Sequence, residues 1–195
     1  MDGHAAACFI GAVPPGLLSH GDRRPRGRES DRPPGAWRLF VSVTAWRLAK
    51  PKHARSAFTG EGARLFGGRW NSLGVPVVYT AESQSLAALE LLVHLDSPAL
   101  LDEYDLIEVQ IDPTLILSLD LHEYPRNWRD TPSPSRLQEI GDAWIAAAKS
   151  VALRVPSSLV PSESNFLLNP KHPDFAQVHI GKPFPFRYDA RLRRK

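Results

Sequence analysis

Cysteine is nearly absent from this sequence, since Cys8 is the only one among its 195 residues. A lone cysteine cannot form an internal disulfide, which is typical of proteins that work in a reducing cytoplasm. No apolar run approaches the roughly 18 residues that a membrane-spanning helix needs. Residues 5–13 are apolar, but no basic residue precedes them, so they do not form a typical signal peptide. We therefore expect a cytoplasmic protein without a membrane segment.

Familiar nucleotide, hydrolase and metal motifs are also missing. Gly60 and Gly62 begin a G-x-G-x-x-G pattern, but the place of its last glycine is taken by Leu65. No glycine-rich loop ends in Gly-Lys-Ser/Thr, and no serine stands in G-x-S-x-G. The seven histidines are scattered and have no partner cysteines. We therefore predict that the protein holds no metal and no resident cofactor.

Composition divides the chain into two parts. Residues 1–36 carry two Pro-Pro pairs, a further proline and a run of arginines, without a lasting hydrophobic period. Such a segment is typical of a disordered or variable extension, and we place the folded domain at residues 37–195. The net charge is +3, and much of the positive charge lies at the two ends. Aromatic residues do not alternate with these charges as base stacking would require, so solvated tails are the simpler interpretation than nucleic-acid binding.

Residues 37–195 mix strand and helix patterns, which predicts an α+β fold with short strands and flanking helices. Helical spacing of apolar residues covers residues 83–95, with Ser83 as N-cap, and residues 135–149. Pro76 is expected to confine its strand to a sheet edge or a strand start. The proline-flanked, polar stretch from Val155 to Pro173 is expected to be a rigid loop. Strand patterns occur at residues 39–48, 75–80, 104–111, 150–155, 175–180 and 184–188.

Four features are unusual, and each has a plain structural alternative. Gly67 and Gly68 before Arg69 permit a close approach by a phosphate, or form an ordinary turn. Glu90, one turn before His94, lies on an otherwise apolar helix, where a carboxylate needs a pocket or sits at a solvent-facing rim. Arg47 alternates with apolar strand residues and faces either a cleft or water. The stretch from Val155 to Pro173 offers Ser157, Asn165 and Asn169 either for function or for capping.

The combination and order of these segments resemble the RES domain over residues 46–192. The matching segments are Trp46–Leu48, Gly60–Asn71, Val78–Ser83, Leu86–Leu95, Gly141–Trp144, Leu153–Pro161 and Asn165–Phe175.

The resemblance implies a diphtheria-toxin-like ADP-ribosyltransferase-type fold and a toxin that cleaves NAD⁺. The products would come from phosphorolysis, hydrolysis or ADP-ribosyl transfer, so NAD⁺ and in one case inorganic phosphate would be substrates. It further implies an Xre-type antitoxin partner, through which alone the protein would meet nucleic acid. By the same resemblance Glu90, Arg47 and Ser157 are catalytic, whereas Arg69, Tyr79 and Asn165 bind NAD⁺.

These residue types suit that chemistry. Cleavage of the nicotinamide glycosidic bond builds positive charge on the ribose, which a carboxylate such as Glu90 stabilises. Arg47 or Arg69 can hold the pyrophosphate through paired hydrogen bonds, and Tyr79 can stack on the cationic nicotinamide ring. Ser157 can orient the ribose or the incoming nucleophile. Two rivals stay open: a non-catalytic binding module partnered with a DNA-binding antitoxin, and a serine hydrolase built on Ser157.

Overall fold

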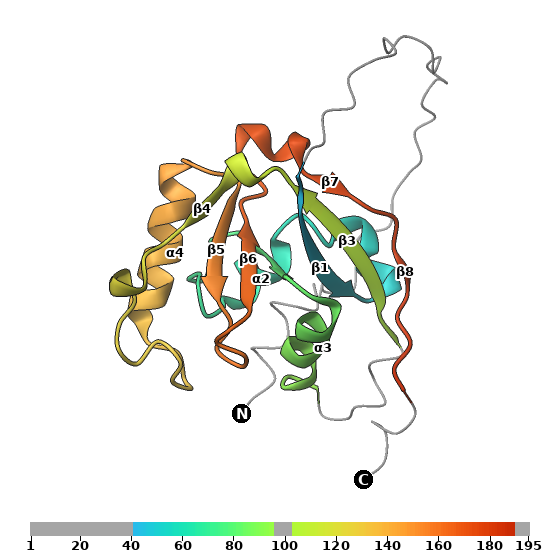
Figure 1. Cartoon of the computed structure of the whole chain (residues 1–195), viewed down its shortest axis with the longest axis horizontal. Coiled ribbons are helices and arrows are strands. Elements are labelled where there is room, and N and C mark those ends of the chain that lie inside the picture. The colour runs from blue at the N-terminus through green and yellow to red at the C-terminus, as the bar shows by residue number, and fades with distance from the viewer. Residues whose placement is uncertain (1–40, 96–102, 190–195) are drawn as a thin grey trace.

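The computed structural model describes residues 41–95 and 103–189, and the predicted extension 1–36 lies outside them (Figure 1). One eight-stranded sheet runs through the described part, in the order β4-β5-β6-β2-β1-β3-β7, with β8 also paired to β3. All pairings are antiparallel except that of β4 with β5. The strands are β1 (Val43–Ala49), β2 (Val78–Ala81), β3 (Asp105–Ile111), β4 (Ile116–Ser118), β5 (Ala152–Pro156), β6 (Ser164–Leu168), β7 (His179–Ile180) and β8 (Phe184–Pro185).

Within the described residues, three α-helices accompany the sheet, and they confirm the predicted α+β class. They are α2 (Glu61–Phe66), α3 (Gln84–Leu92) and α4 (Ser135–Ala147). Short 3-10 helices cover Pro51–Ser56, Pro113–Leu115, Leu121–Glu123 and Pro173–Gln177. In Figure 1, α4 lies on the β4 and β5 side of the sheet, and α3 lies at its lower end beside β1 and β6.

Helix α3 begins where the sequence predicts, because Ser83 caps it. The Ser83 hydroxyl accepts a hydrogen bond from the backbone N–H of Leu86 and donates one to the Glu163 carboxylate. Leu86 and Leu91 are fully buried in the main core cluster, together with Leu48 of β1 and Leu153 of β5. The core between α3, α4 and the sheet therefore fixes the position of α3.

The prediction of a rigid loop from Val155 to Pro173 is wrong for the middle part of this stretch. Residues Ser164–Leu168 form β6, a central strand between β2 and β5, and all five are buried. A strand covered on both faces has no polar–apolar alternation, and two polar residues, Ser164 and Asn165, open this one. The pattern at 175–180 is also shorter than expected, since residues up to Gln177 belong to a 3-10 helix.

Pro76 does not place its strand at an edge. Strand β2 starts two residues later, at Val78, and lies between β6 and β1. Strand β2 makes one residue pair with β1, in which Trp46 lies opposite Ala81. It makes four pairs with β6, and the last of these places Asn165 opposite Ala81. This register positions the first residues of β6 close to the N-terminal end of α3.

Candidate active site

Arg69 stands at the tip of a tight turn. Helix α2 ends at Gly67, whose φ of 70° favours glycine, and the backbone N–H of Gly68 then bonds to the carbonyl of Asn71. The Tyr79 hydroxyl donates to Asn71 Oδ1 at 2.7 Å and accepts from the backbone N–H of Trp70 at 3.1 Å. Tyr79 and Asn71 are almost fully buried, so their hydrogen bonds fix the turn to the protein interior.

Helix α4 holds the same turn from the side. The Gln138 amide donates to the Gly68 carbonyl at 2.9 Å, and the Asp142 carboxylate accepts from the backbone N–H of Ser72 at 3.0 Å. Between them, Gly141 packs against the backbone of Trp70 so closely that an added Cβ would lie 1.8 Å from the Trp70 carbonyl oxygen. The position of Arg69 therefore depends on a helix about 70 residues further along the chain.

Glu90 faces the protein interior, and only 7% of the residue is exposed. Its Oε1 accepts two hydrogen bonds, from Asn165 Nδ2 at 2.7 Å and from Ser157 Oγ at 2.9 Å. The Ser157 hydroxyl in turn accepts from the backbone N–H groups of Leu159 and Val160, both at 3.1 Å. With one proton donated and two bonds accepted, the Ser157 hydroxyl is fully used in orienting Glu90.

Arg69 is near enough to Glu90 for the carboxylate charge to act on its guanidinium. Burial lowers the pKa of the Arg69 guanidinium, while the charge of Glu90 and, less strongly, those of Tyr79 and Asp130 act in the opposite direction. Its Nη1 donates to the carbonyl oxygens of Trp128 at 2.8 Å and Asp130 at 3.2 Å. His94 is close to both charges: burial lowers its pKa, Glu90 opposes that change and Arg69 adds to it.

Arg47 lies elsewhere in the network. Only 3% of the residue is exposed, and its Nη1 donates to the backbone carbonyl of Tyr79 at 2.7 Å. Trp46 and Leu48 pack with the cluster that contains α3, so strand alternation directs Arg47 toward the other face of the sheet. The structure thus brings Glu90, Ser157, Asn165 and Arg69 together, whereas Arg47 contacts the strand that carries Tyr79.

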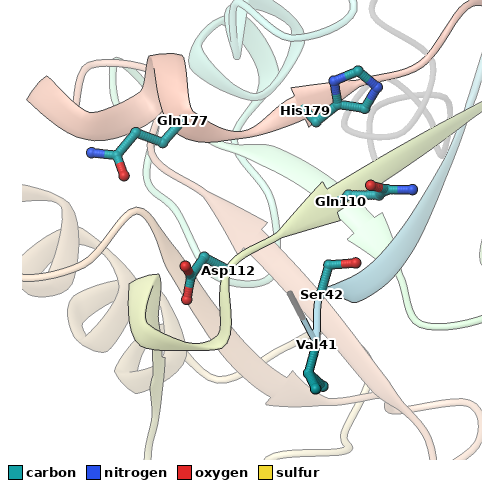
Figure 2. A pocket seen from close by; sticks show the side chains of 6 residues that line it. All are labelled: Val41, Ser42, Gln110, Asp112, Gln177 and His179. Carbon is teal, nitrogen blue, oxygen red and sulfur yellow. The ribbon is translucent and has the colours of Figure 1, made fainter. Parts of the chain in front are cut away.

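A separate hollow of about 310 Å³ lies at the opposite end of the sheet from α3 (Figure 2). Its lining consists mostly of exposed polar residues, none of them among the predicted site residues: Val41, Ser42, Gln110, Asp112, Gln177 and His179. Within residues 41–95 and 103–189, no group of three His, Cys, Asp or Glu side chains is arranged to hold a metal ion. Over the same residues, no helix is both long and apolar enough to cross a membrane.

Sequence reasoning missed the residues that support the site. Asn71 donates to three backbone carbonyls, and Gln138 and Asp142 fix the turn. The segments that resemble the RES domain include Asn71 and Asp142 but indicate no role for either, and Gln138 lies outside those segments. The backbone of residues 128–130, which supplies acceptors to Arg69, gives no signal in the sequence at all.

Comparison with known proteins places this geometry in context. The family model of the RES domain matches residues 44–189. The chain is 40% identical over 149 residues to Toxin Res of Yersinia enterocolitica, covering 76% of this chain and 98% of that protein. It is 35% identical over 161 residues to the Prs ADP-ribosylating toxin of Sphingobium sp. (strain YBL2), covering 80% and 99%.

A solved structure shares the fold. It is the crystal structure of the M. tuberculosis MbcT–MbcA toxin–antitoxin complex, matched with a TM-score of 0.57 and 21% identity over 74% of this chain and 84% of that one. The expectation of short strands with flanking helices is confirmed by this likeness as well as by the strands themselves.

Proposed function

Since the chain belongs to the RES domain family, we propose that it is a toxin that cleaves NAD⁺ at the nicotinamide glycosidic bond. The observation that carries the proposal is the environment of Glu90. One carboxylate is buried, held by two neutral donors on a single oxygen and within electrostatic reach of the guanidinium of Arg69. A carboxylate that is buried, fixed in advance and near a cation is suited to bind a substrate with a developing positive charge.

The second oxygen of Glu90 is the one for the substrate. Ser157 and Asn165 both bind Oε1, which leaves Oε2 for a ribose hydroxyl and for the positive charge that grows on the ribose as the bond breaks. Because the two donors fix the carboxylate beforehand, little reorganisation is needed during the reaction. Ser157 and Asn165 therefore act by positioning Glu90, and neither needs to serve as a nucleophile.

Asn165 offers a further acceptor. Its Oδ1 is buried and has no hydrogen-bond partner within the described part of the chain, although its Nδ2 is bound to Glu90. A buried acceptor without a partner costs free energy, which a donor on the substrate would recover. The ribose hydroxyls and the nicotinamide carboxamide of NAD⁺ are such donors.

Arg69 is the residue that we assign to the pyrophosphate. Its planar guanidinium suits phosphate oxygens, and it lies on a turn that Tyr79 and α4 hold in place. Tyr79, whose ring is buried, supports this turn instead of stacking on nicotinamide. Arg47 acts on the site through its bond to the backbone of Tyr79.

Calorimetric titration with ADP-ribose separates the two arginines. Arg69→Ala should weaken binding about tenfold to a hundredfold, as expected for loss of a charge-assisted phosphate contact. Arg47→Ala should lower the unfolding temperature more than it lowers affinity. Equal loss of affinity in both variants would place Arg47 at the pyrophosphate as well.

Product analysis tests the reaction itself. Purified protein is incubated with NAD⁺, with and without inorganic phosphate, and the nicotinamide and ADP-ribose products are separated by chromatography. ADP-ribose alone indicates hydrolysis, and a phosphorylated ADP-ribose indicates phosphorolysis. ADP-ribose attached to an added protein indicates ADP-ribosyl transfer. The relative named for ADP-ribosylation of Prs makes that protein the first acceptor to add. Absence of nicotinamide release in every mixture would favour the alternative of a non-catalytic binding module.

An antitoxin is the expected partner, since the similar solved structure is a toxin–antitoxin complex. We propose, from the family resemblance, that this antitoxin is of the Xre type. A carboxylate from such a partner, placed on Arg69, would imitate the pyrophosphate and compete with it. Binding of the antitoxin should then weaken when ADP-ribose is present. Residues 1–36 have no part in this scheme, and a chain that starts at Trp37 should cleave NAD⁺ at the parent rate.

A further inference from the structure

Residues 124–130, here called the strap, follow the 3-10 helix Leu121–Glu123 and belong to the segment without regular structure that leads to α4 at Ser135. Two hydrogen bonds shape it: the Trp128 N–H donates to the Pro125 carbonyl, and the Asp130 N–H donates to the Asn127 carbonyl, both at 3.0 Å. These two amide protons report directly on whether the strap keeps its conformation.

Two arginines tie the strap to two separate segments of the Glu90 site. Arg69, from the turn after α2, donates to the carbonyls of Trp128 and Asp130. Arg129, from the strap itself, donates through Nε to the Ser158 carbonyl at 3.3 Å. Ser158 follows Ser157, whose hydroxyl binds Glu90. The strap therefore links the segment that carries the cation to the segment that orients the carboxylate.

The two ends of the strap are held differently. Tyr124 is buried and packs edge-on against Trp70, with ring centroids 5.6 Å apart, and burial raises the pKa of its phenol to about 12. Residues 126, 127, 129 and 130 are exposed, and Trp128 is half-buried. The first end is thus fixed by apolar packing, while the outer part relies on polar contacts that a stronger acceptor can replace.

We propose that Arg69 is a latch that holds the strap across the site until the pyrophosphate of the substrate displaces it. The proposal rests on the proposed function, because it takes Arg69 as the pyrophosphate ligand. Carbonyl oxygens carry only partial negative charge, whereas a pyrophosphate is ionised and can accept two parallel hydrogen bonds from one guanidinium. Since one Arg69 nitrogen serves both carbonyls, a phosphate that takes this donor frees Trp128 and Asp130 together.

Hydrogen exchange of the full chain without ligand tests the latch. In Arg69→Ala, the amides of Trp128 and Asp130 should exchange about tenfold to a hundredfold faster, as expected for loss of a charge-assisted contact. Arg64→Ala is the matched control, because Arg64 binds Glu61 on the surface of α2 and should leave the strap unchanged. Arg129→Ala removes the other tie at an exposed position, so it provides a second measurement even if Arg69→Ala folds poorly. Unchanged exchange in folded Arg69→Ala and in Arg129→Ala would overturn the latch.

Saturation of the unmodified chain with ADP-ribose, which cannot be cleaved further at the nicotinamide bond, tests the displacement. Calorimetry establishes binding, and exchange at Trp128 and Asp130 should then become faster while the amides of α4 keep their rates. Binding without faster exchange would overturn the latch and leave the proposed function intact. Failure of ADP-ribose to bind would instead count against the assignment of Arg69 to the pyrophosphate, with the Arg69→Ala experiment still deciding whether the strap is latched.

Discussion

Helices α3 and α4 both pack on the sheet, but they differ in which residues they bury. Helix α4 follows the usual rule, with Leu137 and Trp144 inside and the Arg136–Glu139 ion pair in solvent. Helix α3 does the reverse at two positions: Glu90 is buried, whereas Leu89 is 43% exposed. Leu86 and Leu91 of α3 are nevertheless fully buried in the core, so burial and the hydrogen bonds from Ser157 and Asn165 to Glu90 favour the same orientation. The orientation of α3 therefore serves both the core and the site, whereas that of α4 follows from core burial.

The largest expected effect removes the charge of Glu90. Glu90→Gln should lower the rate of nicotinamide release about 10²–10³-fold, the usual cost of losing one preorganised electrostatic group. Glutamine keeps a carbonyl acceptor for Ser157 and Asn165, so the unfolding temperature should change little. Glu139→Gln on the solvent side of α4 is the matched control and should leave both rate and stability unchanged. Full activity in a folded Glu90→Gln protein would contradict the assignment of this carboxylate.

The next effect concerns α4. Gly141→Ala places a Cβ against the Trp70 carbonyl and should lower the free energy of unfolding by about 3 kcal/mol, since neither backbone segment can move without the other. Chemical denaturation followed by circular dichroism measures this loss. Ala143→Leu adds more volume on the exposed side of the same helix and should stay within about 0.5 kcal/mol of the parent. Similar stability of the two variants would show that α4 does not clamp the Arg69 turn.

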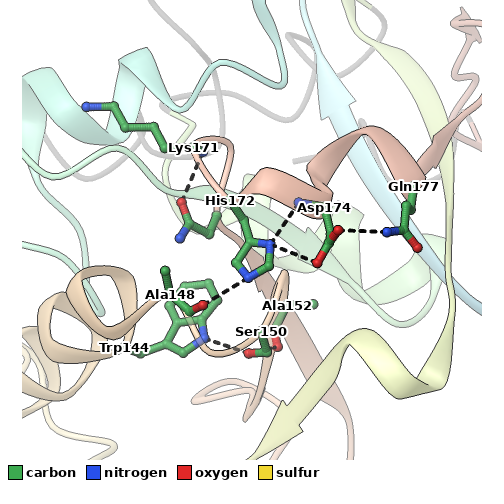
Figure 3. Close-up of polar contacts among 9 residues, drawn as sticks. Trp144, Ala148, Ser150, Ala152, Lys171, His172, Asp174 and Gln177 are labelled. Carbon is green, nitrogen blue, oxygen red and sulfur yellow. Dashed lines mark hydrogen bonds and ion pairs between the residues drawn. The ribbon is translucent and has the colours of Figure 1, made fainter.

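A substitution at the end of α4 should have a smaller effect and should raise the free energy of unfolding instead of lowering it. Ala148 ends the helix with a φ of 45°, a region that favours glycine, and its carbonyl meets the His172 ring at 3.0 Å (Figure 3). Ala148→Gly should therefore raise the free energy of unfolding by about 1 kcal/mol. Ala146→Gly, within the helix, should lower it by about the same amount. A loss of stability in Ala148→Gly would contradict the assignment of strain to the positive φ of Ala148.

The smallest expected effect is on the pH dependence of stability, through His94 just after the end of α3. Burial lowers the folded-state pKa of His94, so the unfolded chain binds a proton more readily. The stability contributed by neutral His94 is fully present above its unfolded pKa of about 6.5 and is lost as the pH falls toward the lowered folded-state value. In His94→Gln the decline of unfolding free energy below pH 6.5 should be shallower. His122→Gln, an exposed control, should keep the slope of the parent, and identical slopes in all three proteins would contradict the prediction.

Local signals explain what could be predicted from the sequence. Ser83 and the apolar spacing after it gave α3 its correct start, and strand patterns located β1 and β3 to within a few residues. Strand β6 was missed because a short strand buried on both faces resembles any apolar run, and its first two residues are polar. Glu90 stood out as a carboxylate on an apolar helix, although its direction could not be decided.

The contacts within the site could not be predicted, because they join distant segments. Asn165 meets Glu90 across 75 residues of sequence, and Arg69 meets the strap across 59. Spacing along the chain carries no information on such pairs. It also could not separate Arg47 from Arg69, whereas in the structure Arg69 is near enough to Glu90 for the two charges to interact and Arg47 binds the Tyr79 carbonyl.

The separation between Glu90 and its two donors has a consequence for the order of synthesis. Translation produces Glu90 first, and the residues that orient it, Ser157 and Asn165, follow 67 and 75 positions later. A nascent chain that stops before Ser157 has the carboxylate but lacks both donors, and it has not yet completed the sheet on which α3 rests. The cell would thus make most of this protein before any molecule of it can act, which leaves time for a partner to meet the chain as it folds.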